Sequence, residues 1–137
     1  MRQILIIDDS EDDCLLIRHI LAKGSENFSV HDVSGVQPAI DYLTDDGDEH
    51  PRPELILCDL IMPRQDGLSF LKWFRMQSEL TSIKVAIMSG TYTEATIEEA
   101  RAGGACACID KGNLFRNPAP FYKAVQLCLS GEHAFVM

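Results

Sequence analysis

The sequence predicts an α/β fold in which a five-stranded parallel sheet is covered by helices on both faces. Short apolar runs alternate with segments of helical periodicity along the whole chain, the pattern of successive strand–helix units. The runs 4–7, 55–58 and 85–88 are apolar at every position, which is typical of parallel strands buried on both faces. Such units connect by right-handed crossovers and leave helices on both sides of the sheet.

The expected strands have different environments. The second lies at an edge, because Val30 and Val33 stand among polar residues, whereas the continuously apolar runs belong in the centre of the sheet. The five strands are expected at 3–7, 28–33, 54–58, 84–88 and 105–109.

Helix signals fill the segments between the strands. Ser10 is a typical N-cap for the first helix, and Asp13 follows in the pattern of a capping box. Gly103-Gly104 marks a helix end. The later helices are expected at 36–44, 67–77, 93–102 and from Pro118 or Pro120 onward.

Length and composition indicate one soluble unit. A chain of 137 residues with 46% hydrophobic and 24% charged residues fits a single domain, 1–137. The net charge of −9 argues against binding to nucleic acid or to an anionic membrane. No apolar stretch approaches the roughly 20 residues of a membrane span, and the N-terminus lacks a secretion signal. We therefore expect a cytoplasmic protein without membrane insertion.

The cysteines are expected to be reduced core thiols in a reducing compartment, because they lie mostly in apolar segments and form no CxxC pair. Cys106 and Cys108 are expected on one face of the last strand. No spacing supplies further ligands for a metal there. The five are Cys14, Cys58, Cys106, Cys108 and Cys128.

Polar side chains follow four of the expected strands where each strand ends. They are Asp8 and Asp9 after the first strand, Asp59 after the third, Ser89 after the fourth and Lys111 after the fifth. Because the carboxyl ends of parallel strands meet at one edge of the sheet, where ligands bind, we expect these side chains to lie together.

Three neighbouring carboxylates need positive charge. Unpaired, they repel and raise one another's pKa values, and a divalent cation removes this repulsion. Ligands that are all oxygen favour Mg²⁺, and Lys111 can pair with a carboxylate or a phosphoryl oxygen. An aspartate after a strand can also be a simple cap or turn residue, but the complete set favours a site.

Over residues 2–130 the chain resembles a bacterial response-regulator receiver domain. The resemblance rests on Ile7-Asp8-Asp9-Ser10, on Cys58-Asp59-Leu60-Ile61-Met62-Pro63 with Asp66-Gly67, and on Ser89 and Lys111 in their order and spacing. It implies a flavodoxin-like doubly wound sheet of order 2-1-3-4-5. It also implies a signalling protein of a phosphorelay that is not an enzyme for other substrates.

The resemblance assigns a role to each residue of the set. A sensor histidine kinase or a histidine phosphotransfer protein would donate the phosphoryl group. The implied roles are Asp59 as phosphoacceptor, Asp8, Asp9, Asp59 and the backbone carbonyl of Ile61 as Mg²⁺ ligands, Lys111 as a phosphoryl contact, and Ser89 as the hydroxyl that reorients toward the phosphoryl group.

The implied output is contact with another protein. Residues 131–137 are too few to fold as an output domain, so a stand-alone receiver is expected. The family's usual face joins the fourth helix, the fifth strand and the fifth helix, here about 93–103, 105–109 and 118–129. A homodimer through this face is compatible with the sequence.

The chain departs from the family pattern at three positions. Cys108 stands where an aromatic residue is common, and Tyr92 is a candidate to replace that ring. Gly112 follows Lys111 where proline is usual. The apolar Ile61 follows Asp59 by two positions, which predicts a persistent phosphoryl group because no polar side chain there helps to orient water.

Two other functions compete with that of a receiver. Phosphatases of the haloacid dehalogenase class also use an aspartyl nucleophile, but theirs opens a DxD pattern, whereas here Asp8-Asp9-Ser10 follows the first strand. The second alternative is a receiver-like adaptor that works without phosphorylation, which the changes at Cys108 and Gly112 favour.

Overall fold

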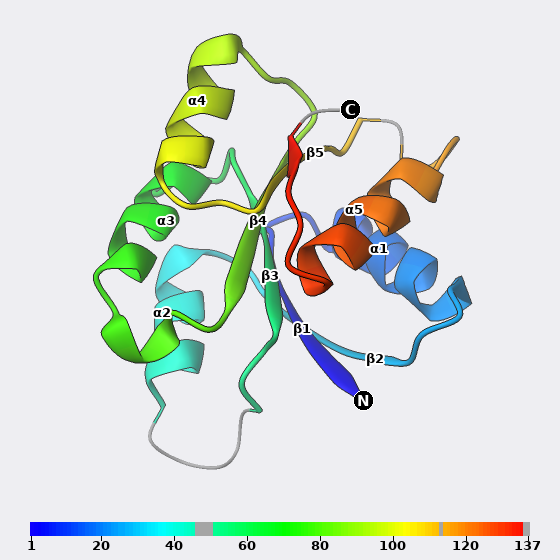
Figure 1. Ribbon diagram of the computed structural model, residues 1–137, viewed down its shortest axis with the longest axis horizontal. Helices are drawn as coiled ribbons and strands as arrows, with labels where there is room; N and C mark the ends of the chain where they lie inside the picture. Colours follow the sequence, from blue (N-terminus) through cyan, green and yellow to red (C-terminus); the bar gives the residue numbers. More distant parts are fainter. Residues whose placement is uncertain (46–50, 113, 136–137) are drawn as a thin grey trace.

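The computed structural model describes residues 1–45, 51–112 and 114–135. Its strands form one parallel sheet in the order β2-β1-β3-β4-β5-β6 (Figure 1). The predicted order 2-1-3-4-5 is confirmed, with one added strand. The strands are β1 Arg2–Ile7, β2 Phe28–Val33, β3 Leu55–Asp59, β4 Lys84–Ser89, β5 Ala107–Asp110 and β6 Ala134–Phe135.

The helices lie in two layers, with α1 and α5 on one face of the sheet and α2, α3 and α4 on the other (Figure 1). This confirms the doubly wound arrangement. Their bounds are α1 Glu11–Lys23, α2 Val36–Thr44, α3 Gly67–Arg75, α4 Glu94–Ala102 and α5 Ala119–Leu129, with a 3₁₀ turn at Ser78–Leu80.

The central strands divide their side chains between two cores, because successive residues of a strand point to opposite faces. Ile4 and Ile6 of β1 pack on the α1 and α5 side with Phe121. Leu5 and Ile7 pack on the other side, in the cluster that contains Phe70. Every residue of β3 is buried. The carboxyl ends of β1 and β3 are thereby held rigidly side by side.

The sixth strand was not among the five that the sequence predicted. It forms because the outer edge of β5 offers free hydrogen-bonding groups that can pair with another strand. The N–H of Ala134 donates to the carbonyl oxygen of Cys106 (3.0 Å). The ring of Phe135 lies 4.6 Å from the guanidinium of Arg101 on α4, which adds a cation–π contact.

The expectation that Cys106 and Cys108 share a face is wrong. β5 begins at Ala107 rather than at residue 105, so Cys106 precedes the strand and does not follow its alternation. Cys106 packs on the α1 and α5 side, whereas Cys108 packs on the side of α2, α3 and α4.

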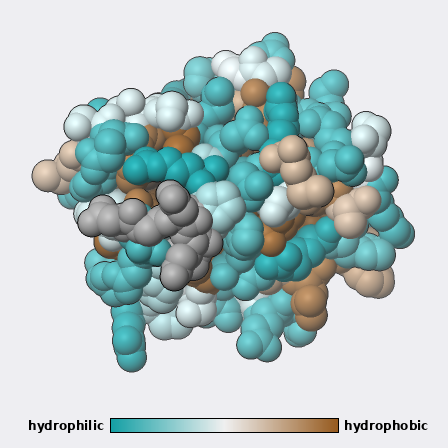
Figure 2. All heavy atoms as spheres, turned by 90° about the horizontal axis from the view of Figure 1, so that it is seen from below, coloured by the Kyte–Doolittle hydropathy of each residue, from teal (hydrophilic) through white to brown (hydrophobic). Residues whose placement is uncertain are grey.

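The surface agrees with a core enclosed by helices. Seen from below, it is mostly hydrophilic, and hydrophobic side chains appear only in small separate patches (Figure 2). Within the described part of the chain, no helix has the length and apolar character that a membrane crossing requires.

Candidate metal centre

The carboxylates gather where β1 and β3 end. Asp8 follows β1 directly, Asp59 is the last residue of β3, and the pairing of Ile7 with Cys58 brings the two strand ends into line. Asp8 is 3% exposed and Asp59 is 6% exposed, whereas Asp9 is exposed. Each of the three offers one carboxylate oxygen, and these oxygens lie within 4.8 Å of one another. The donor set is all oxygen and fits a hard divalent cation.

Lys111 stands at the centre of the negative charge. Its Nζ lies 2.8 Å from Asp8 Oδ2, 2.8 Å from Asp13 Oδ2 and 3.2 Å from Asp59 Oδ2. The backbone positions Lys111, because its N–H donates to the carbonyl oxygen of Ser89, the last residue of β4 (2.8 Å). One ammonium therefore partly neutralises three carboxylates.

Asp13 is a member of this cluster that the sequence pattern did not reveal. It was expected to complete a capping box with Ser10. The Ser10 hydroxyl does accept from the Asp13 N–H (3.3 Å), but the Ser10 N–H donates to Asp8 Oδ1 (3.0 Å). The Asp13 carboxylate turns to Lys111 instead. A signal was present, since acidic residues in the first helical turn face the carboxyl edge of the sheet.

The electrostatics reflect burial and crowding. Burial, followed by repulsion from Asp8, raises the pKa of Asp59 to about 6, although Lys111 and the backbone N–H of Ile61 act in the opposite direction. Burial by itself would lower the pKa of Lys111, but hydrogen bonds with Asp13 and Asp8 and the charge of Asp59 outweigh it and raise that pKa. The lysine therefore stays charged, while Asp59 lacks enough positive charge around it.

Ser89 is close in the fold but is bonded elsewhere. It is the last residue of β4 and is 1% exposed. Its hydroxyl donates to the carbonyl oxygen of Thr91 (2.7 Å) and accepts from the Thr91 N–H (3.1 Å). These two bonds hold the loop between β4 and α4 against the end of the strand.

Tyr92, in the same loop, connects β4 to β5. Its hydroxyl donates to the carbonyl oxygens of Ile109 (2.8 Å) and Ile87 (3.0 Å). Its ring packs on the cluster that contains Cys108. Burial raises the pKa of the Tyr92 hydroxyl, which therefore remains a donor. The Tyr92 ring thus lies on the same side of β5 as the small side chain of Cys108.

The loop between β3 and α3 closes the site. Ile61 is 64% exposed, and its backbone N–H bonds to the Asp59 carboxylate. Arg64 has a φ of 74°, the left-handed conformation of a tight turn. A glycine is required at position 67 by close approach to the backbone of β3. A Cβ atom there would lie 2.6 Å from the carbonyl oxygen of Asp59.

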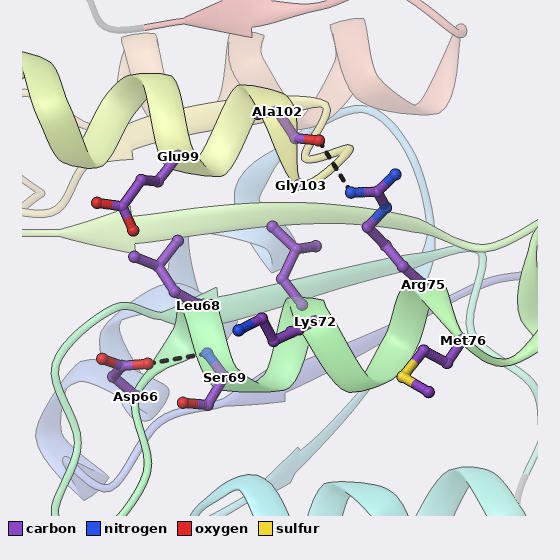
Figure 3. A pocket seen from close by; sticks show the side chains of 10 residues that line it. Asp66, Leu68, Ser69, Lys72, Arg75, Met76, Glu99, Ala102 and Gly103 are labelled. Atoms are coloured by element: carbon purple, nitrogen blue, oxygen red, sulfur yellow. Dashed lines mark hydrogen bonds between the residues drawn. The ribbon is translucent and has the colours of Figure 1, made fainter.

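Two hollows on the surface differ in their relation to the site. One of about 330 Å³ is lined by residues that include Asp8, Asp9 and Asp32. The other lies between α3 and α4, where Arg75 donates to the carbonyl oxygen of Ala102 (3.1 Å) and Glu99 faces α3 (Figure 3). The second hollow contains none of the residues of the carboxylate centre.

A match to a protein-family model decides the family. The model describes the response regulator receiver domain, and it matches residues 4–117. The chain belongs to the response regulator receiver domain family. It is therefore a receiver domain of two-component signalling, a family that binds a divalent metal and interacts with kinases and downstream targets.

Individual relatives of this receiver agree. It is 32% identical over 111 residues to the polar-differentiation response regulator DivK of Brucella anthropi, covering 80% of this chain and 84% of DivK. It is 28% identical over 93 residues to the response regulator Rcp1 of Synechocystis sp., covering 66% of this chain and 63% of Rcp1.

A solved structure supports the same fold. The Mn²⁺-bound form of Rcp1 superposes on this receiver with a TM-score of 0.76 and 25% identity, over 92% of this chain and 90% of that one. Of the predicted site residues, the receiver brings Asp8, Asp9, Asp59 and Lys111 together. It places Ser89 at the adjoining strand end, bonded to Thr91.

Proposed function

We propose that Asp59 accepts a phosphoryl group from the phosphohistidine of a sensor histidine kinase or a histidine phosphotransfer protein. The observation that carries this proposal is a buried Asp59 carboxylate among Asp8, Asp9 and Lys111, with Lys111 Nζ at 3.2 Å. Burying an ionised carboxylate without a partner costs free energy. Here Asp8 adds repulsion to the Asp59 carboxylate, while Lys111 offsets it with a positive charge. Such a group is suited to chemistry rather than to packing.

The reaction is an in-line displacement at phosphorus. A carboxylate oxygen of Asp59 forms the new O–P bond while the bond from phosphorus to the donor imidazole nitrogen breaks, and the nitrogen keeps the electron pair. The product is an acyl phosphate on Asp59. Phosphoryl transfer depends mainly on positioning and on neutralising the oxygens of the transferred group. Lys111 is placed to contact one of these oxygens.

The carboxylates fit Mg²⁺. Asp8, Asp9 and Asp59, with the backbone carbonyl of Ile61, would hold the ion. When bound, it supplies the positive charge that the crowded carboxylates lack and that the incoming phosphoryl oxygens require. Asp8 is already oriented for this role, because Ser10 N–H and Lys111 Nζ each occupy one of its oxygens.

The switch begins at Ser89. A dianionic group on Asp59 offers new acceptor oxygens, and the Ser89 hydroxyl leaves the Thr91 carbonyl to donate to one of them. The loop then loses one of the two bonds that hold it to the end of β4. Tyr92 is the ring that carries this release to β5, because its hydroxyl depends on carbonyl groups of both strands.

We further propose that residues 1–137 act as one cytoplasmic receiver unit whose output is a separate protein. The face formed by α4, β5 and α5 is the docking surface, and β6 lies along its strand. A homodimer through the same face is compatible with this arrangement. The acidic balance of −9 supports a protein partner rather than nucleic acid.

The test is an intact-mass measurement after incubation with Mg²⁺ and a small phosphodonor such as acetyl phosphate. We expect one added phosphoryl group on the wild type and none on Asp59→Asn, and EDTA should suppress the addition. Asp66→Asn, outside the carboxylate cluster, serves as the control and should still be modified. An unmodified wild type that retains partner binding would favour the phosphorylation-independent adaptor instead.

A further inference from the structure

Two of the cysteines that were expected to be reduced core thiols lie in direct contact with each other. Cys106 immediately precedes β5, and Cys128 lies near the end of α5. Their Sγ atoms are 2.6 Å apart although the residues are 22 positions apart in the sequence. Cys106 is 6% exposed and Cys128 is fully buried. Among the described cysteines, no other two have a sulfur–sulfur contact.

The backbone holds both cysteines at the junction of three elements. The carbonyl oxygen of Cys128 accepts from the Gly131 N–H (3.1 Å), and the carbonyl oxygen of Cys106 accepts from the Ala134 N–H (3.0 Å). The segment that leads from α5 to β6 is therefore attached at one end to Cys128 and at the other to Cys106. A bond between the two sulfurs would join β5 to α5 where β6 begins.

The two thiols are not equivalent. The hydrogen bond from the Cys106 thiol lowers the pKa of Cys128, and the charge of Lys84 acts in the same direction against burial. The same contact, together with burial, raises the pKa of Cys106. The contact therefore favours the thiolate form, which is the reactive form, at Cys128 over Cys106.

We propose that Cys106 and Cys128 form a redox-active dithiol that closes to an intramolecular disulfide when a peroxide reaches it. The sulfurs need only a small approach, because a disulfide bond joins them at about 2.0 Å. The pair lies in the core and would link the residue before β5 to α5, two elements whose surfaces are assigned to output, so oxidation would restrain how they move relative to each other. The modification stands on the sulfur contact and does not depend on phosphorylation of Asp59.

The chemistry balances with hydrogen peroxide as the oxidant. The Cys128 thiolate attacks one peroxide oxygen, the O–O bond breaks, and the second oxygen leaves as hydroxide, which takes up a proton to become water. The Cys106 sulfur then attacks the sulfur of the Cys128 sulfenic acid, the S–O bond breaks, and that oxygen leaves as water with the Cys106 proton. Two thiols and one peroxide give one disulfide and two waters.

The experiment counts free thiols in the full chain. Protein treated with dithiothreitol or with hydrogen peroxide is denatured in N-ethylmaleimide and weighed intact. The reduced protein should carry five adducts, one for each cysteine, and the oxidised protein three, on a chain lighter by two hydrogens. Dithiothreitol should restore five. Fragment spectra of the cross-linked peptides should join Cys106, rather than Cys108, to Cys128.

Variants supply the controls. Cys128→Ser and Cys106→Ser should each abolish the peroxide-dependent loss of two adducts. Cys108→Ser, in β5 two residues after Cys106 and 1% exposed, should retain that loss. Five adducts after peroxide, a disulfide between chains, a different pairing, or only sulfinic and sulfonic acids would overturn the proposal. The wild-type measurement decides even where a variant fails to fold.

Discussion

The carboxyl ends of β1 and β3 and the region around β5 represent two ways of building function into this fold. At β1 and β3, the carboxylates stand at or directly after the ends of buried strands, so the register of the sheet brings Asp8 and Asp59 together. Around β5, the contacts are made by side chains from other elements: Tyr92 from a loop, Cys128 from α5 and Phe135 from β6. In our proposal, phosphoryl transfer depends on residues at the strand ends, whereas its readout depends on side-chain packing around β5.

The largest effect should follow from removing Lys111, the ammonium group that the carboxylates at the ends of β1 and β3 share. We expect Lys111→Ala to slow phosphoryl uptake by roughly 100-fold, because a preorganised positive group is lost from the transferred oxygens. Uptake rates from intact mass at fixed phosphodonor and Mg²⁺ measure this. Lys123→Ala, an exposed lysine on α5, is the control. An unchanged rate in Lys111→Ala would show that strand-end geometry suffices without the lysine.

The raised pKa of Asp59 predicts a pH-dependent stability difference in EDTA. The folded state binds this proton more tightly than the unfolded chain does, since the pKa rises from 3.8 to about 6. Stability from this group is therefore present below pH 3.8 and is lost as the pH rises through about 6. Asp59→Asn should be more stable than wild type at pH 7 by up to about 3 kcal/mol.

Denaturant titrations at pH 4 and pH 7 measure that difference. It should shrink toward pH 4, where the wild-type carboxyl is protonated, and Mg²⁺ should reduce it by stabilising the wild type. Asp41→Asn, at an exposed position on α2, controls for the loss of a negative charge. An Asp59→Asn variant less stable than wild type at pH 7 would contradict the claim that burial and repulsion destabilise the Asp59 carboxylate.

A smaller effect should separate chemistry from readout. Tyr92→Phe removes the hydroxyl that bonds to Ile87 and Ile109, and we expect a stability loss of about 1 kcal/mol. Phosphoryl uptake should be unchanged, but the phosphorylation-dependent rise in hydrogen exchange at residues 90–93 should no longer reach 107–110. Tyr122→Phe, on α5, is the control. Slower uptake in Tyr92→Phe would show that the two regions are not separable.

The smallest effect concerns the lifetime of the phosphoryl group. Ile61 is exposed two positions after Asp59, and we expect its side chain to shield an acyl phosphate on Asp59 from water. Ile61→Ala should shorten the half-life of the phosphorylated form by a few-fold, measured as loss of the phosphoryl mass after donor removal. Met76→Ala, another exposed apolar residue, should leave it unchanged. An unaltered half-life in Ile61→Ala would contradict the shielding role.

The strands were predictable because continuous apolar runs mark buried parallel strands, whereas the order of the sheet came from the resemblance to receiver domains. The residues at the ends of β1, β3, β4 and β5 followed from the same pattern. Asp13 was missed because its cap position explained it without reference to Lys111. Side chains that satisfy two roles are difficult to assign from local signals alone.

The region around β5 was less predictable for a physical reason. β6 has only two residues and forms because β5 offers an unpaired edge, which is a property of the folded sheet. The contact between Cys106 and Cys128 depends on how α5 packs on β5. The start of β5 at Ala107 also changed which face Cys106 occupies. None of these has a short-range sequence signal.

Identification of the modified residue tests the central claim most directly. Protein phosphorylated with acetyl phosphate and Mg²⁺ is treated with borohydride, which reduces an acyl phosphate on aspartate to homoserine, and is then digested and sequenced by mass spectrometry. We expect homoserine at position 59 and unmodified aspartate at Asp8, Asp9 and Asp13. Homoserine at any of those three positions, or none at position 59 in protein that carries the phosphoryl mass, would contradict the assignment.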